Sequence, residues 1–197
     1  MEQSTQEIEL EAKGLLIESE YSTLLAFFEL ERDEAKKQVN YYLDTQDMRL
    51  NARSITLRVR EKKGIYELTV KEDASEGGRL ETNHRPLTSE QLEELRRYGV
   101  IPDGNVKDAL NRLGVLPPFL YQGDLITYRI EIPWKGCKLA LDYNTYLGTS
   151  DYEIEVEKDS ESADEQQILT DLLKELDIEY RPAISKTKRF FKVKEGK

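Results

Sequence analysis

The chain has 197 residues, of which 29 are Lys or Arg and 39 are Asp or Glu, and its formal net charge is −10. This acidity argues against broad nucleic-acid binding, which draws most of its affinity from cations against phosphates. No apolar run approaches the roughly 20 residues that span a bilayer, and the polar N-terminus lacks the features of a signal peptide. Cys137 is the single cysteine, which excludes an internal disulfide. We therefore expect a globular, cytoplasmic protein without a membrane or nucleic-acid partner.

The first elements follow one another as strand, helix and strand. Residues 7–13 alternate charged and apolar side chains, which is the period of a β-strand. Residues 18–30 place their apolar side chains at helical intervals. Residues 40–45 form a short aromatic-rich segment that we interpret as a strand. The chain therefore begins as a mixture of both element types.

The middle of the chain contains a predicted hairpin. Residues 54–61 and 66–71 alternate with the strand period, and the turn-prone Lys62-Lys63-Gly64 joins them. A short strand with Arg79 and Glu81 follows a polar loop. Thr88 is then the expected N-cap of a helix that runs to Tyr98.

The last third returns to strands after a second helical pattern. The apolar periodicity predicts that helices and strands alternate through this part of the chain. The expected elements are a helix over 106–113, strands over 125–132, 138–142 and 152–157, a helix over 163–176 and a short basic helix within 185–192. No clear linker interrupts this series, although Pro117-Pro118 is the place where two domains could divide. We predict a single domain over residues 1–197.

Each predicted strand has one apolar and one charged face. A sheet with one wet side alternates in this way by default, so the charges could lie on a solvated exterior. Like charges, however, repeat along single strands, in rows formed by Glu7, Glu9 and Glu11 and by Glu153, Glu155 and Glu157. Neighbours in such a row lie only about 6 to 7 Å apart and repel one another. Rows of carboxylates suit hard divalent cations.

Other strands carry the opposite charge, through Arg58, Arg60, Lys71 and Arg129. The arginine fork grips phosphate oxygens in pairs, whereas lysine acts as a point charge. If the sheet closes with its charged face inward, a polyphosphate held by these cations and bridged through metal to the carboxylates would neutralise both sets. The amphipathic helices would then cover the apolar outer face.

Several motifs resemble the CYTH superfamily, also called triphosphate tunnel metalloenzymes, and in particular its small bacterial YjbK-type members. Residues 9–13 read Glu-Leu-Glu-Ala-Lys, which resembles the ExExK motif near the N-terminus of that family. The resemblance covers nearly the whole chain and rests on an ordered series of motifs. These are Tyr42-Leu43-Asp44-Thr45, Leu57-Arg58-Val59-Arg60, Lys71, Arg79 and Glu81, Arg129, Leu141-Asp142, Glu153-Ile154-Glu155, and Ser185-Lys186 with Arg189.

The resemblance implies an α+β fold built on a closed eight-stranded antiparallel β-barrel, a tunnel with a charged interior and helices packed outside. It also implies a metal-dependent triphosphatase that uses Mg²⁺ or Mn²⁺. The implied phosphate ligands are Lys13, Arg58, Arg60, Lys71, Arg129, Lys186 and Arg189. The implied metal ligands are Glu9, Glu11, Glu153, Glu155 and Asp142. Glu11, Lys71 and Glu155 are the candidates for catalysis, by orienting or deprotonating the attacking water.

Two other functions stay open at this stage. A class IV-type adenylate cyclase would bind ATP in the same way, and a noncatalytic sensor would bind polyphosphate or a nucleotide without turnover. The acidic metal ligands favour an enzyme, because phosphate capture alone would not need them. His84, the single histidine, is expected in a surface loop and has no partner for a metal site. The chain could be a monomer or a homodimer.

Overall fold

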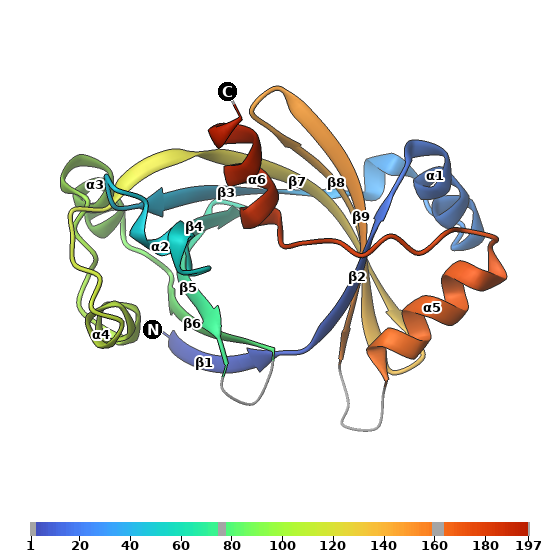
Figure 1. The fold of residues 1–197 in the computed structure, drawn as a ribbon, viewed down its shortest axis with the longest axis horizontal. Coiled ribbons are helices and arrows are strands. Elements are labelled where there is room, and N and C mark those ends of the chain that lie inside the picture. The colour runs from blue at the N-terminus through green and yellow to red at the C-terminus, as the bar shows by residue number, and fades with distance from the viewer. Residues whose placement is uncertain (1–2, 75–77, 159–163, 197) are drawn as a thin grey trace. The chain divides into compact units, whose positions relative to one another are not determined.

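The computed structural model describes residues 3–74, 78–158 and 164–196, and Figure 1 shows its elements in chain order. Most of the predicted elements are present, with bounds that shift by a few residues. The strands are β1 Gln3–Glu9, β2 Glu11–Leu16, β3 Lys36–Asp44, β4 Thr56–Lys62, β5 Ile65–Asp73, β6 Arg79–Arg85, β7 Leu120–Trp134, β8 Cys137–Tyr146 and β9 Thr149–Lys158. The α-helices are α1 Glu18–Phe27, α2 Arg49–Ala52, α3 Ser89–Tyr98, α4 Asn105–Arg112, α5 Glu165–Glu175 and α6 Lys186–Glu195.

The strands have the order β1-β6-β5-β4-β3-β7-β8-β9-β2. The expected closed eight-stranded barrel is wrong, because the described residues form a sheet of nine strands whose order has two ends. The physical reason lies at Leu10, where the predicted strand over 7–13 is interrupted. The part before Leu10 is β1 and neighbours β6, whereas the part after it is β2 and pairs antiparallel with β9. The predicted α+β class with an antiparallel sheet is confirmed.

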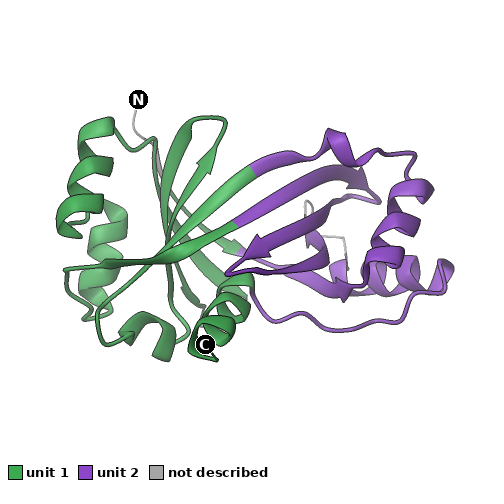
Figure 2. Cartoon of the chain, turned by 90° about the horizontal axis from the view of Figure 1, so that it is seen from above, with its two compact units in different colours: residues 1–8, 38–125, 186–197 green, residues 9–37, 126–185 purple. Residues whose placement is uncertain are grey.

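The chain forms two compact units, which Figure 2 distinguishes by colour. Unit 1 comprises residues 1–8, 38–125 and 186–197, and unit 2 comprises residues 9–37 and 126–185. Each unit has its own group of buried apolar residues. Predicted site residues are found in both units.

Unit 1 is built around the hairpin of β4 and β5, as predicted. Lys63 and Gly64 both have positive φ, at 54° and 76°, so the tight turn uses the conformation that glycine allows most readily. The apolar faces of these strands pack against α3 and α4, in a core that includes Leu57, Leu68 and Leu110.

The N-cap of α3 is confirmed, whereas the placement of His84 is wrong. The side chain of Thr88 accepts a hydrogen bond from the Gln91 backbone N–H. His84 lies in β6, only 5% exposed, because that strand extends to Arg85 rather than ending near Glu81. Its ring Nε2 is buried without a hydrogen-bond partner among the described residues.

Unit 2 places α1 and α5 against the apolar face of β2, β8 and β9. Leu139, Leu141, Ile154 and Val156 occupy alternate positions along β8 and β9, and all four are fully buried. The contacts with α5 cover this apolar face, so the charged residues in between are left on the opposite face of the sheet. Packing of helices on the apolar side therefore confirms which face of these strands is the core.

Candidate functional site

An acidic centre lies on the charged face of unit 2. Asp142 of β8 is directly opposite Glu153 of β9, and Glu155 is the next residue on the same face of β9. These three side chains offer carboxylate oxygens that all lie within 4.8 Å of one another. Asp142 and Glu153 are 0% exposed. Three of the five predicted metal ligands are thus brought together by the pairing of two strands.

Arg129 of β7 neutralises part of this centre. Its Nε donates to Asp142 Oδ1 over 2.7 Å and its Nη2 to Asp142 Oδ2 over 2.6 Å, while Nη2 also donates to Glu155. Burial alone lowers the pKa of Arg129, but attraction by Asp142 and Glu155 outweighs it and raises the pKa well above its ordinary value. Arg129 therefore stays a cation. In this structure its fork is bound to carboxylates.

Glu11 and Lys13 lie beside this centre on β2. Lys13 is directly opposite Glu155 in the register of β2 and β9, and its Nζ forms an ion pair with Glu11. Glu9, at the end of β1, is half-buried. The next residue of the acidic row on β9, Glu157, pairs with Lys138 instead. The motif at residues 9–13 thus lies next to the acidic centre, with Lys13 in register with it.

The donor set of the acidic centre fits a hard divalent cation such as Mg²⁺ or Mn²⁺. Such cations prefer oxygen ligands, and Mg²⁺ is commonly held by one or two carboxylates with water completing its shell. With all three carboxylates counted as charged, they and one guanidinium have a formal charge of −2, which a divalent cation would balance. Asp142, Glu153 and Glu155 are the residues that would hold it.

A basic face lies in unit 1. Lys71 of β5 is opposite both Thr56 of β4 and Glu81 of β6, and its Nζ forms an ion pair with Glu81. Arg58 belongs to the same face and is only 7% exposed. Its Nη2 lies 3.7 Å from the Glu81 carboxylate, which is within ion-pair range but too long for a hydrogen bond.

Arg58 has unused hydrogen-bond donors. Its Nε and Nη2 atoms are buried and make no hydrogen bond to any of the residues in the described ranges. Leaving charged donors buried and unsatisfied is costly, so such groups are commonly found where an anion binds. Arg60, two residues along β4, donates from Nε to the Asn40 side chain over 3.2 Å.

Helix α6 brings two further predicted residues to unit 1. The Thr187 hydroxyl forms a hydrogen bond of 3.1 Å with the Thr56 hydroxyl, and the Phe190 ring lies 4.9 Å from the ring of Tyr42. Tyr42 is directly opposite Arg58 in the register of β3 and β4. Helix α6 therefore packs on the face that carries Arg58. Lys186 begins this helix, and Arg189 is 7% exposed within it.

Neutral polar residues on the same faces were missed by the sequence analysis. Thr69 donates to Asn83 over 2.7 Å in unit 1, and Thr127 donates to Asn144 over 2.7 Å in unit 2. All four are 4% exposed or less. Thr69, Thr127 and Asn144 each lie two residues from a predicted ligand on the same strand, and Asn83 is directly opposite Thr69, so the alternation itself was the signal that could have found them.

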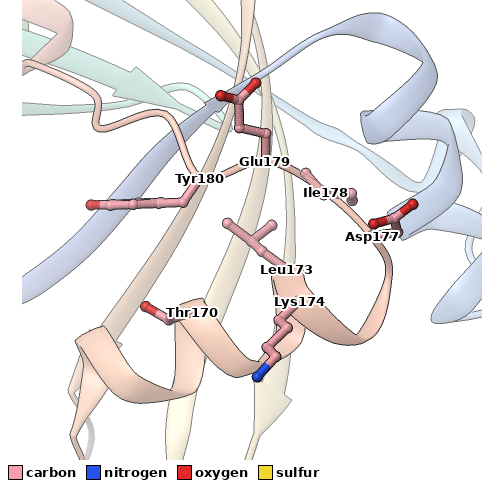
Figure 3. A pocket seen from close by; sticks show the side chains of 7 residues that line it. All are labelled: Thr170, Leu173, Lys174, Asp177, Ile178, Glu179 and Tyr180. Atoms are coloured by element: carbon pink, nitrogen blue, oxygen red, sulfur yellow. The ribbon is translucent and has the colours of Figure 1, made fainter.

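A groove of about 380 Å³ lies elsewhere in unit 2, between α5 and the segment that follows it (Figure 3). Its lining includes no predicted site residue. It is formed by Thr170, Leu173, Lys174, Asp177, Ile178, Glu179 and Tyr180. The lining of this groove therefore includes none of the predicted phosphate or metal ligands.

Comparison with known proteins identifies the family. The model of the CYTH domain matches residues 7–191. This chain belongs to the CYTH family. A Bacillus subtilis member, named "Putative triphosphatase YjbK", is 35% identical over 191 residues, which cover 96% of this chain and 97% of that protein.

Solved structures of other proteins share this fold. A Bacillus halodurans protein described as a "putative adenylate cyclase" has a TM-score of 0.87 at 34% identity, over 94% of this chain and 98% of that one. The Hippeastrum protein HpAC1, described with a dominant triphosphatase activity, has a TM-score of 0.76 at 23% identity, over 94% and 96% of the two chains. No helix among the described residues has the length and apolar character to cross a membrane.

Proposed function

We propose that this protein is a metal-dependent triphosphatase that hydrolyses inorganic triphosphate or a related organic triphosphate. Membership of the CYTH family supports an activity on triphosphates, as does the triphosphatase name of the B. subtilis relative. The two clusters have the complementary chemistry that this reaction needs, because one offers cations and the other offers carboxylates. Three further predictions belong to this proposal: the chain is a single domain, it is cytoplasmic, and it is a monomer or a homodimer.

The observation that carries the proposal is the buried guanidinium of Arg58. Two of its N–H donors are buried and have no acceptor among the described residues, in a face that also holds Lys71. Phosphate oxygens are the natural acceptors for a planar arginine fork. A small anion of high charge therefore fits this face better than a neutral ligand.

In the proposed reaction, basic residues bind and orient the phosphate chain. Arg58 and Arg60 would hold phosphoryl oxygens, and the phosphate-binding set would be completed by Lys13, Lys71, Arg129, Lys186 and Arg189. A divalent cation, when bound by the carboxylates, would neutralise charge that develops on the transferred phosphoryl group and activate water. Glu9 and Glu11 would support that cation together with the acidic centre. Glu11, Lys71 and Glu155 are the residues proposed to orient or deprotonate the attacking water.

The test is release of phosphate and pyrophosphate from inorganic triphosphate, thiamine triphosphate and ATP, each with Mg²⁺, Mn²⁺ or EDTA. We expect metal-dependent release from at least one of them. Glu11→Ala and Arg58→Ala should each lower kcat/KM by about 10²-fold, the usual effect of removing one preorganised electrostatic group. The matched controls are Glu93→Ala and Arg97→Ala, two exposed residues of α3, which should behave as wild type.

The outcomes separate the competing functions. Pyrophosphate together with a cyclic nucleotide from ATP would establish an adenylate cyclase instead. Binding of triphosphate without release from any substrate would establish a noncatalytic sensor. Metal-dependent release that is unaffected by Glu11→Ala and Arg58→Ala would contradict the assignment of the site.

A further inference from the structure

We propose that residues 180–183 form a strap that positions Lys13, and that Tyr180 and Gly14 are positioning residues for the proposed triphosphatase. This inference rests on the function proposed above, in which Lys13 binds phosphate. Every contact that carries it lies within unit 2.

The strap pairs with the edge of β2 that faces away from β9. Strand β2 pairs with β9 along one edge, and alternate backbone groups point to the other edge. There the Leu15 N–H donates to the Arg181 carbonyl over 2.8 Å, and Gly14 forms an antiparallel bridge with Pro182. An edge strand otherwise presents unpaired backbone groups, so these contacts pair part of that edge of β2.

The backbone carbonyl of Lys13 accepts two hydrogen bonds from the strap. It accepts from the Tyr180 hydroxyl over 3.3 Å and from the Ala183 N–H over 3.5 Å. Two donors from one short segment thus converge on the backbone of a residue that the reaction is proposed to use. The Lys13 side chain forms an ion pair with Glu11, and the residue is directly opposite Glu155. A shift of this backbone would move the ammonium group relative to both carboxylates.

Gly14 allows the strap to come this close. A Cβ at Gly14 would lie 3.4 Å from the Arg181 carbonyl oxygen and 3.4 Å from Cε2 of the Tyr180 ring. A single methyl group would just reach contact distance, whereas a branched side chain would displace the strap. Because valine favours β-strands, Gly14→Val should leave the pairing of β2 with β9 intact.

The strap is anchored just before its first residue and again in its middle. Before it, Ile178 is buried in the core of unit 2 and its N–H donates to the Leu173 carbonyl over 2.8 Å. Within it, the Arg181 guanidinium forms an ion pair with Glu20 of α1. Only three residues then separate Pro182 from Lys186, a predicted phosphate ligand. The strap is therefore a short, fixed connection that holds Lys13 and leads directly into α6.

The experiment is a double-mutant cycle on kcat/KM for triphosphate hydrolysis, using Gly14→Val and Lys13→Met singly and together. A displacement of about 1 Å can cost as much as 10²-fold in rate, so we expect Gly14→Val to lower kcat/KM by about 10-fold or more. In the Lys13→Met background the same substitution should change kcat/KM less than 2-fold, because the strap acts through Lys13. Gly14→Ala should have an intermediate effect. Hydrogen exchange of the Leu15 amide should accelerate in Gly14→Val.

Tyr180→Phe provides a second route that removes one hydroxyl and keeps the ring. We expect it to lower kcat/KM several-fold in the wild-type background and to have no effect when Lys13 is Met. Tyr98→Phe, at an exposed tyrosine of α3, is the matched control and should have no effect. The proposed role of the strap would be overturned if each substitution changed kcat/KM by the same factor in both backgrounds. It would also be overturned if Gly14→Val kept wild-type activity while its Leu15 amide exchanged rapidly. A wild-type protein that hydrolyses no triphosphate would instead overturn the proposed function, and with it the reaction that the strap serves.

Discussion

The two units differ in how their buried charges are satisfied. In unit 2, Arg129 donates hydrogen bonds to Asp142 and Glu155, so its cation is neutralised within the protein. In unit 1, the buried Arg58 lies 3.7 Å from the Glu81 carboxylate, and its Nε and Nη2 donate to none of the described residues. The first arrangement leaves an excess of carboxylate and suits a metal cation. The second leaves unused donors and suits an anion.

Among the substitutions that test this difference between the units, Glu153→Gln is expected to have the largest effect. This substitution keeps the shape of a side chain that is 0% exposed but removes one charge from the acidic centre. We expect Mn²⁺ binding, measured by calorimetry, to weaken strongly and metal-dependent hydrolysis to fall by about 10² to 10³-fold. Glu93→Gln on α3 is the control. Unchanged Mn²⁺ affinity in Glu153→Gln would show that the metal binds elsewhere.

Stability should separate the two arginines. Arg129→Met leaves Asp142 and Glu155 without their guanidinium, and breaking a buried pair in this way costs about 3 to 5 kcal/mol. Arg58→Met removes no hydrogen bond from Nε or Nη2 to any described residue, and Glu81 keeps its ion pair with Lys71. We expect the free energy of unfolding, from urea titration, to change by about 1 kcal/mol or less in that variant, because losing the contact with Glu81 is offset by no longer burying unsatisfied donors. Similar losses in both variants would contradict the contrast.

Stabilisation by triphosphate and stabilisation by Mn²⁺ should each depend on a different one of the two clusters. A ligand that binds the folded state alone stabilises it by about 2.7 kcal/mol at 100 times its dissociation constant. Inorganic triphosphate in EDTA should therefore raise the Tm of wild type but not of Arg58→Met. Mn²⁺ alone should raise the Tm of wild type but not of Glu153→Gln. If each variant lost both responses, the two clusters would not be independent.

The smallest predicted effect is a pH dependence in unit 2. Burial, and then the nearby charge of Asp142, raise the pKa of Tyr21 above its ordinary value of 10.0. Above that pH the unfolded chain loses the phenolic proton while the folded protein keeps it, so the free energy of unfolding falls as pH rises from 10 toward the raised pKa. Urea titrations at increasing pH should show a shallower fall in Tyr21→Phe. An identical fall in that variant would exclude Tyr21 as its source.

Much of the local structure around the candidate site could be predicted from alternation and from neighbouring residues. The hairpin turn at Lys63-Gly64 and the N-cap at Thr88 depend on neighbouring residues, and both were found. Pairs such as Asp142 and Glu153 belong to strands that are consecutive in the chain, so their shared face followed from the strand period. Thr69 and Asn144 were missed because they lie on the charged faces but are themselves neutral, and a neutral residue in such a row does not indicate a ligand.

The sequence by itself determined which residues share a face of each strand, because a side-chain period of two is a local property of the backbone. The tertiary structure alone decided that the first strand breaks at Leu10 and that its halves have different neighbours, β6 and β9. It also decided that His84 is buried and that two buried donors of Arg58 have no acceptor within the described part of the chain. Strand partners and burial depend on residues far apart in the chain, and no local pattern records them.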